Sequence, residues 1–165
     1  AVEAVLRSDF LTQGPAIERF EARVAAACGA RHAIAVSSAT AALHVGCLAA
    51  GLGPGDRLWT SPNSFVASAN CALYCGATVE FIDIRPDTYN LDPDLLSERL
   101  EEAARQGRLP KIVVPVHFAG QPCRMDAIAA ACERHGVTVL EDASHAIGAR
   151  FRGEFRDCQG VVRAR

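Results

Sequence analysis

Two carboxylates and a histidine follow an apolar run near the end of the chain. The run VTVL covers residues 137–140, Glu141 and Asp142 come next, and His145 stands three residues beyond Asp142. A carboxylate buried at a strand end needs a cationic partner to remain ionised, and the protonated nitrogen of a pyridine ring is one such partner. Asp142 could instead cap the next turn, with His145 in solvent, and the local sequence does not separate these interpretations.

A second segment, VSSATAAL at residues 36–43, places small hydroxyl residues before an alanine-rich helix. A helix N-terminus has free N–H groups and a positive dipole end, so it can bind a phosphate. Ser37, Ser38 and Thr40 would add hydroxyl donors, and Ala39 would let the anion approach closely. Ordinary N-capping explains the same residues and is the simpler interpretation of this segment alone. The chain has no GxxxxGK[ST] loop and no GxGxxG after a predicted strand, which disfavours nucleotide hydrolysis and dinucleotide binding.

Three further side chains could act at the same place. Phe65, in SPNSFVASAN at 61–70, follows a predicted strand and could cover a flat ligand ring, although a core position is the commoner use of phenylalanine. His117 directly follows the run IVVPV at 112–116 and could ligate a metal together with Asp142 and His145. For Cys71 and Cys75 we favour core packing over a zinc site, because neither a second pair nor a histidine at finger spacing accompanies them.

The elements that must position these residues alternate between strands and helices. Strands are predicted over 32–36, 57–60, 78–84, 112–116 and 137–140, with helices beginning at Pro15, near residue 40, across 63–75, at Pro93 after an Asp92 cap, and around Met125. Apolar strands alternating with helices predict an α/β fold with a mostly parallel sheet covered on both faces. Ligands of such sheets bind beyond the carboxyl ends of the strands.

Composition narrows the function classes. The 165 residues carry a net charge of −2 and are 50% hydrophobic, which is typical of a soluble globular protein and argues against nucleic-acid and membrane partners. The seven cysteines are odd in number and mostly lie in alanine-rich segments, so we expect reduced thiols in a cytoplasmic protein. Lys111 is the single lysine among the 17 lysines and arginines, which leaves one candidate for any lysine nucleophile.

Seven segments in this order and spacing resemble the sugar aminotransferases of the DegT/DnrJ type. They are SDFLTQGP (8–15), SSATAALH (37–44), GPGD (53–56), FVASANCALYCGA (65–77), DTYNLDP (87–93), VPVHFAGQP (114–122) and EDASHAIGA (141–149). The resemblance implies a fold type I large domain over residues 1–154, followed by a divergent or truncated tail at 155–165. It also implies pyridoxal 5′-phosphate (PLP) as cofactor and a homodimer as the intact enzyme.

The resemblance assigns roles residue by residue. Ala39 and Thr40 match the turn that holds the cofactor phosphate, and Phe65 matches the aromatic residue stacked on the pyridine ring. Asp142 matches the partner of the ring nitrogen, and His145 matches the residue beside the ring hydroxyl. A substrate-side loop near the dimer interface is matched by Asp9, Phe10, Leu11 and Thr12. The implied reaction moves an amino group from glutamate to the 4-keto group of a UDP-linked 6-deoxy-N-acetylhexosamine, as in pseudaminic acid and surface-glycan synthesis.

One expected part of the family pattern is absent from the sequence. The family's Schiff-base lysine lies in an SFxxxK-like segment beyond the EDASHA motif, whereas this chain reads FRDCQGVVRAR there, so that lysine is expected beyond Arg165. Lys111 begins a strand whose other end faces the site, roughly 16 Å away, and cannot replace it. We therefore expect an incomplete large domain, truncated or shifted in reading frame and inactive by itself. The alternatives are a non-catalytic protein that binds PLP or a nucleotide sugar, and a metal-dependent hydrolase using His117, Asp142 and His145.

Overall fold

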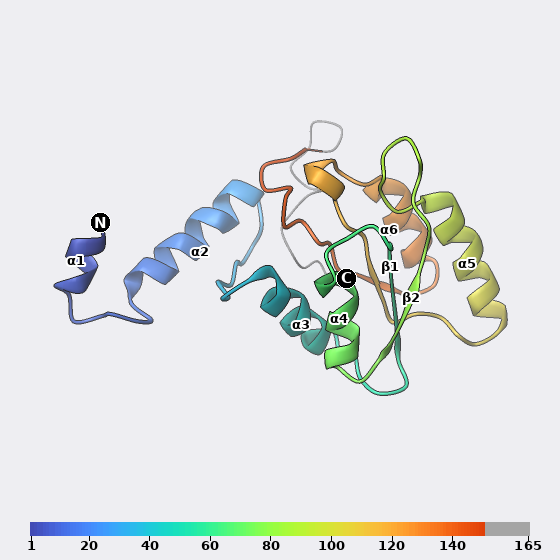
Figure 1. Ribbon diagram of the computed structural model, residues 1–165, viewed down its shortest axis with the longest axis horizontal. Coiled ribbons are helices and arrows are strands. Elements are labelled where there is room, and N and C mark those ends of the chain that lie inside the picture. Colours follow the sequence, from blue (N-terminus) through green and yellow to red (C-terminus); the bar gives the residue numbers. More distant parts are fainter. Residues whose placement is uncertain (151–165) are drawn as a thin grey trace.

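A four-stranded parallel sheet forms the centre of the molecule. The structure is a computed structural model and describes residues 1–150. The strands are β1 (Arg57–Thr60), β2 (Thr78–Phe81), β3 (Ile112–Val114) and β4 (Thr138–Val139), in the spatial order β2-β1-β3-β4 (Figure 1). The helices are α1 (Val2–Leu6), α2 (Pro15–Cys28), α3 (Ala39–Ala49), α4 (Ala67–Tyr74), α5 (Pro93–Arg105), the short 3-10 turn η1 (Phe118–Gly120) and α6 (Met125–Glu133).

Helices cover both faces of this sheet, as the sequence predicts. Successive side chains of a strand point to opposite faces, so each strand contributes to two cores. Trp59 and Val113 pack in one core with α5 and α6, whereas their neighbours Leu58 and Ile112 pack in the other with α3 and α4. The central strand β3, Ile-Val-Val, is therefore apolar along its whole length, because both of its faces are buried.

The ends of the helices follow the local sequence signals. The carboxylate of Asp92 accepts hydrogen bonds from the backbone N–H groups of Asp94 and Leu95, and Pro93 occupies the first turn of α5. Helix α2 likewise begins at a proline and ends at Gly29, whose φ of 63° is the left-handed conformation that glycine adopts readily. These observations confirm both predicted helix starts.

Strand order places a topological switch point at the carboxyl edge of the sheet. From β1 the chain goes to β2 on one side, then returns to β3 on the other side and continues to β4. The loops after β1 and β3 therefore separate at this edge, and such a switch point is where open parallel sheets bind ligands. Asp142 extends the same edge, since its N–H donates to the Pro115 carbonyl and its carbonyl accepts from the His117 N–H.

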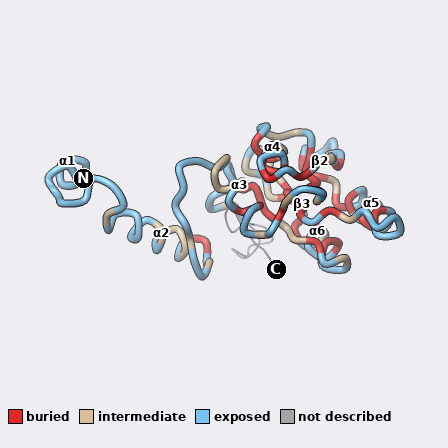
Figure 2. The backbone as a smooth tube through the Cα atoms, turned by 90° about the horizontal axis from the view of Figure 1, so that it is seen from below, coloured by how far each residue is buried: buried red, intermediate tan, exposed pale blue. Residues whose placement is uncertain are grey.

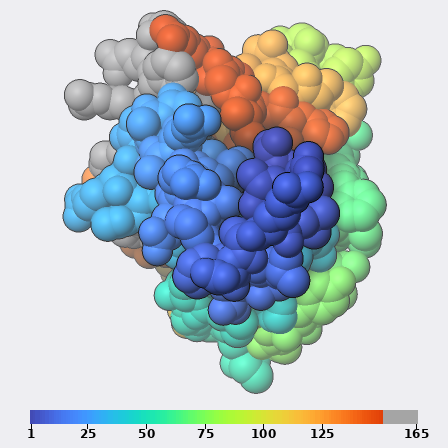
Figure 3. Space-filling view, turned by 90° about the vertical axis from the view of Figure 1, so that its left-hand side faces the viewer, coloured from blue at the N-terminus to red at the C-terminus, as the bar shows by residue number. Residues whose placement is uncertain are grey.

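The first two helices form an N-terminal arm, residues 1–28, that projects from the body of the molecule (Figure 1). Its residues are mostly exposed (Figure 2), and viewed from that side the arm lies in front of the body (Figure 3). The apolar side chains of α2 are poorly covered, because Phe20 is 59% exposed and Ile17 is exposed too. Among residues 1–150, no helix combines the length and hydropathy needed to cross a membrane.

The predicted strand at 32–36 is not formed. This segment is extended, but it pairs with none of the four described strands, and Ile34 is 79% exposed. The Ala35 N–H instead donates to the Glu21 side chain at 2.7 Å. High β-propensity creates no strand without a neighbouring ladder to supply hydrogen bonds, which is the physical reason for the difference.

Lys111 lies at the amino end of β3, where the sequence places it. Its Nζ donates to the Gly51 carbonyl at 2.6 Å and to the Asp56 carboxylate at 2.9 Å. The hydrogen bond from Lys111, supported by the Gly53 N–H, lowers the pKa of Asp56 below its ordinary value of 3.8. Lys111 thus holds a turn at the edge of the sheet opposite to Asp142.

This pair predicts a pH-dependent contribution to stability. A carboxyl group with a lowered pKa in the folded state stabilises the fold above its unfolded value of 3.8, and the contribution disappears as the pH falls through the folded value. We expect Lys111→Met to raise the pKa of Asp56, as measured by NMR titration of its carboxyl carbon. Arg108→Met is the matched control, since Arg108 approaches Glu80 instead. An unchanged Asp56 pKa in Lys111→Met would contradict this assignment.

Candidate active site

The Asp142 carboxylate is the centre of the candidate site. It is 6% exposed, and its Oδ1 accepts from the Ser144 N–H at 3.2 Å and from the Ser144 hydroxyl at 2.5 Å. Its Oδ2 accepts from the Ser68 hydroxyl at 2.7 Å. Within residues 1–150 these donors are hydroxyls and an N–H group, and none is a cationic side chain. An ionised carboxylate accepts about four hydrogen bonds, so one acceptor position remains for a ligand.

Ser68 connects this carboxylate to the first turn of α4. Its side chain is almost completely buried, at 1% exposure, and its oxygen lies 2.6 Å from the Ser64 hydroxyl oxygen. Ser64 and Ser68 are four residues apart, and the Ser68 N–H bonds to the Phe65 carbonyl, so a helical turn brings the two serines together. Sequence analysis missed both serines, although the spacing in SFVAS carries this signal.

Glu141 and His117 form a separate buried pair beside Asp142. The His117 Nε2 lies 3.1 Å from the Glu141 Oε2, and the His117 Nδ1 accepts from the Cys123 N–H. Since Nδ1 is an acceptor, Nε2 carries the ring proton and donates it to Glu141. Both ring nitrogens are therefore engaged, which leaves no lone pair for a metal and argues against the hydrolase hypothesis. Among the described residues, no group of three histidine, cysteine or acidic side chains could hold a metal ion.

A buried asparagine, Asn90, fixes the loop that follows β3. Its Nδ2 donates to the carbonyls of Gln121 and Pro122, and its Oδ1 accepts from the Phe118 N–H. One side chain thus satisfies three backbone groups of a segment that has no ladder of its own. Sequence analysis did not single out Asn90, because nothing in its local sequence indicates contacts with residues about 30 positions away.

The predicted loop residue His145 is exposed, and its backbone is fixed by Gly120. A Cβ atom at Gly120 would lie 2.8 Å from the His145 carbonyl oxygen, closer than real Cβ contacts come, and Gly120 has a φ of 85°. Glycine is therefore required twice over at this position. The contact joins the loops after β3 and β4, which brings the His145 segment to the carboxyl edge.

Phe65 is 74% exposed, which makes its ring available to a ligand and contradicts the core position that its residue type favours. It comes from the loop after β1, immediately before the Ser68 turn, and so belongs to the same edge as Asp142. Ala39 and Thr40 begin α3, where the Ser38 side chain accepts from the Ala41 N–H. The capping interpretation of Ser38 is therefore confirmed, and Ala39 is exposed at the helix N-terminus, as an anion would require.

The predicted substrate-side residues lie elsewhere. Asp9, Phe10, Leu11 and Thr12 join α1 to α2 on the arm, which projects from the body of the molecule (Figure 1), and all four are exposed. The structure therefore brings Asp142, His145 and the Phe65 segment to one edge and leaves the 9–12 loop apart. Whether that loop acts at a site remains a prediction.

Three cysteines lie near the site in the apolar core between α3 and α4. Cys47, Cys71 and Cys75 are buried, and their thiols are free. A hydrogen bond with Cys71, together with burial, raises the pKa of Cys47, whereas the same hydrogen bond lowers the pKa of Cys71. Their positions among apolar side chains agree with the packing role we favour for Cys71 and Cys75.

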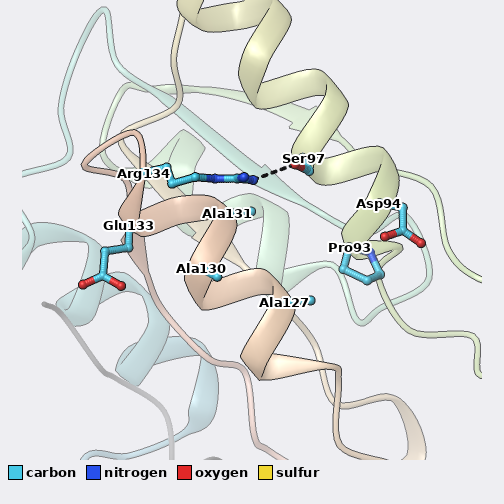
Figure 4. A pocket seen from close by; sticks show the side chains of 8 residues that line it. All are labelled: Pro93, Asp94, Ser97, Ala127, Ala130, Ala131, Glu133 and Arg134. Carbon is cyan, nitrogen blue, oxygen red and sulfur yellow. Dashed lines mark hydrogen bonds between the residues drawn. The ribbon is translucent and has the colours of Figure 1, made fainter.

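A groove of about 580 Å³ lies between α5 and α6, away from these residues. Figure 4 shows Pro93 and Ser97 on one wall, Ala127 and Ala131 on the other, and Arg134 donating to Ser97 at 2.8 Å. Its lining includes none of the candidate site residues that the sequence predicts.

Comparison with known proteins gives one consistent result. Residues 1–160 match the DegT/DnrJ/EryC1/StrS aminotransferase family. The chain is 48% identical over 151 residues to the spore coat polysaccharide biosynthesis protein SpsC of Bacillus subtilis, with 92% of this chain and 37% of SpsC covered. The chain therefore spans little more than a third of the length of that relative.

Solved structures agree with the sequence match. DesV of S. venezuelae superposes with a TM-score of 0.85 and 35% identity, covering 93% of this chain and 40% of DesV. NtdA of Bacillus subtilis, solved with bound cofactor pyridoxamine phosphate (PMP), has a TM-score of 0.79 and 36% identity, covering 88% of this chain and 32% of NtdA. These similarities confirm the fold type I large domain that the sequence predicts.

The Gly120 contact predicts a difference between two glycine substitutions. Gly136 also has a positive φ, 66°, but a Cβ there would meet nothing within 4 Å. We expect Gly136→Ala to lower the free energy of unfolding by about 1 kcal/mol through backbone strain alone. Gly120→Ala should cost roughly 1–2 kcal/mol more, since the His145 carbonyl must also move. Urea denaturation of both variants measures the difference, and equal losses would show that the contact is unimportant.

Proposed function

The chain belongs to the DegT/DnrJ/EryC1/StrS aminotransferase family, and from this premise we propose that residues 1–154 form part of the large domain of a PLP-dependent aminotransferase. The observation that carries the proposal is the buried Asp142 carboxylate, which has three neutral hydrogen-bond donors and one acceptor position to spare. A protonated pyridine nitrogen supplies the cationic N–H that such a group accommodates best.

The residue types present suit the chemistry of the cofactor. Asp142 would accept the ring N–H, the exposed ring of Phe65 would stack on the pyridine face, and the N–H groups at Ala39 and Thr40 would receive the phosphate. His145 would lie beside the ring hydroxyl. When bound, PLP supplies a conjugated ring that takes up the electron pair released at the substrate carbon. The task of Asp142 is to keep the proton on the ring nitrogen, on which that capacity depends.

The position of the single lysine argues against catalysis by these 165 residues alone. Lys111, the single lysine, is bound to Asp56 and Gly51 at the opposite edge of the sheet. No lysine in the sequence can therefore hold the cofactor covalently or move a proton at the substrate carbon. We propose that this chain contributes cofactor contacts and does not transaminate by itself, which keeps non-catalytic binding of PLP or a nucleotide sugar as the second candidate.

For the substrates, we propose glutamate as amino donor and the 4-keto group of a UDP-linked 6-deoxy-N-acetylhexosamine as acceptor. This proposal rests on the seven segments that resemble the DegT/DnrJ-type enzymes and on the likeness to SpsC, a polysaccharide biosynthesis protein. Surface-glycan synthesis is the process in which such an amino sugar would be used. The buried free thiols of residues 1–150 suit the reducing compartment in which nucleotide sugars are made.

A homodimer explains the position of the substrate-side loop. Because the arm projects from the body, the loop of Asp9, Phe10, Leu11 and Thr12 lies apart from the sheet of its own chain. The exposed apolar side chains of the arm, Phe10, Leu11 and Phe20 among them, are suited to cover a second copy. We propose that the arm reaches the site of that second copy and brings the 9–12 loop to its substrate.

The cofactor assignment predicts the binding of PMP, which needs no covalent bond to lysine. We expect the 165-residue chain to bind PMP, as measured by fluorescence titration, and to bind pyridoxamine without the phosphate more weakly. Asp142→Asn should weaken PMP binding about 10–100-fold, because a charge-assisted hydrogen bond is lost. Asp94→Asn, which neutralises an exposed carboxylate of α5, should bind like the wild type. Binding that is equal in Asp142→Asn and the wild type would refute the assignment of Asp142.

The substrate assignment predicts selectivity for the nucleotide. With PMP bound, we expect UDP-N-acetylglucosamine to bind about tenfold more tightly than dTDP-glucose, measured by calorimetry, because the UDP-linked N-acetyl sugar resembles the proposed substrate. Phe10→Ala should weaken binding of the UDP sugar and leave PMP affinity unchanged. Equal affinity for the two sugars would overturn the proposed substrate without affecting the cofactor assignment.

A further inference from the structure

The donor order within the two serines and Asp142 is fixed by proton count. Asp142, as a carboxylate, has no proton to give, so the Ser68 hydroxyl must donate to its Oδ2 at 2.7 Å. Ser68 then has no second proton, and the 2.6 Å contact with Ser64 requires Ser64 to be the donor. The direction therefore runs from Ser64 to Ser68 to Asp142, and each bond polarises the next.

This arrangement controls the direction in which Asp142 points. Ser144 holds Oδ1 from the loop that follows Asp142 itself, whereas Ser68 holds Oδ2 from α4, a different element. Two anchors on different elements fix the torsion of a carboxylate, and the remaining acceptor position then has a fixed direction. Ser68 is 1% exposed, so water does not substitute for its hydroxyl.

The same turn carries Phe65. Ser64 precedes Phe65 directly, and the Phe65 carbonyl accepts from the Ser68 N–H at 3.2 Å. The aromatic ring proposed to cover the pyridine and the hydroxyl that orients the carboxylate thus belong to one five-residue segment, 64–68. A cofactor ring would meet two groups whose relative position is set by a single helical turn.

We propose that Ser64 and Ser68 form a hydroxyl relay that aims the Asp142 carboxylate at the ring nitrogen of the cofactor. Both are positioning residues, since they act through Asp142, and the inference rests on the proposed function. Ser68 contacts Asp142 directly, whereas Ser64 orients and polarises Ser68. Removing the Ser68 hydroxyl should therefore affect Asp142 more than removing the Ser64 hydroxyl.

The test compares PMP with 1-deaza-PMP, in which a C–H group replaces the ring nitrogen. We expect Ser68→Ala to weaken PMP binding about tenfold, and Ser64→Ala to weaken it about threefold. The affinity for 1-deaza-PMP should be the same in the wild type and both variants, because that ligand has no ring N–H group to donate to Asp142. Ser97→Ala, which removes one hydrogen bond in the α5–α6 groove, is the control and should bind both ligands like the wild type.

The ligand pair separates positioning from structure. If the serines were merely structural, their substitution would lower the affinity for both ligands alike. That result, or unchanged PMP affinity in Ser68→Ala, would overturn the relay while leaving the proposed function intact. Wild-type protein that binds neither ligand would overturn the proposed function and the relay with it. If Ser68→Ala does not fold, the half-buried Ser64 gives the same comparison, and equal losses for both ligands in Ser64→Ala would again refute the relay.

Discussion

The constraint on which the site depends is the cost of taking the Asp142 carboxylate out of water. A charge at 6% exposure is stable only if its oxygens are hydrogen-bonded, and three donors from two different elements meet this requirement. These bonds also require α4, the end of β4 and the following turn to keep fixed relative positions. The chemistry and the packing of the sheet edge are therefore set by the same contacts.

Beside Asp142, Glu141 faces the same cost and meets it differently. His117 donates to it from the end of β3, and the Cys123 N–H fixes the tautomer that makes this possible. Two adjacent carboxylates are thus buried at one strand end, one with a histidine and the other with hydroxyls. The difference matters because Glu141 already faces the His117 ring N–H, whereas Asp142 keeps an acceptor position for a cationic ligand.

The sequence predicts the sheet, its two-sided cover and the edge that carries the site, because strand hydrophobicity, caps and prolines act within a few residues of where they stand. It predicts Asp142 and Phe65 for the same reason, since each lies in the segment that follows a strand. It misses Ser68, whose role depends on a partner 74 positions away, and Asn90, which binds backbone groups about 30 positions away. It also predicts a strand at 32–36 that is not formed, since pairing depends on a neighbour that local propensity does not specify.

The exposed apolar surface of the arm has a consequence for how the protein behaves in solution. Residues 1–28 contribute little to the two cores of residues 1–150, and burial against a second copy would give their exposed apolar side chains a favourable environment. In the proposed homodimer, association would stabilise the fold by mass action, and the unfolding midpoint would then rise with protein concentration. A melting temperature of such a dimer would describe its stability only at a stated protein concentration.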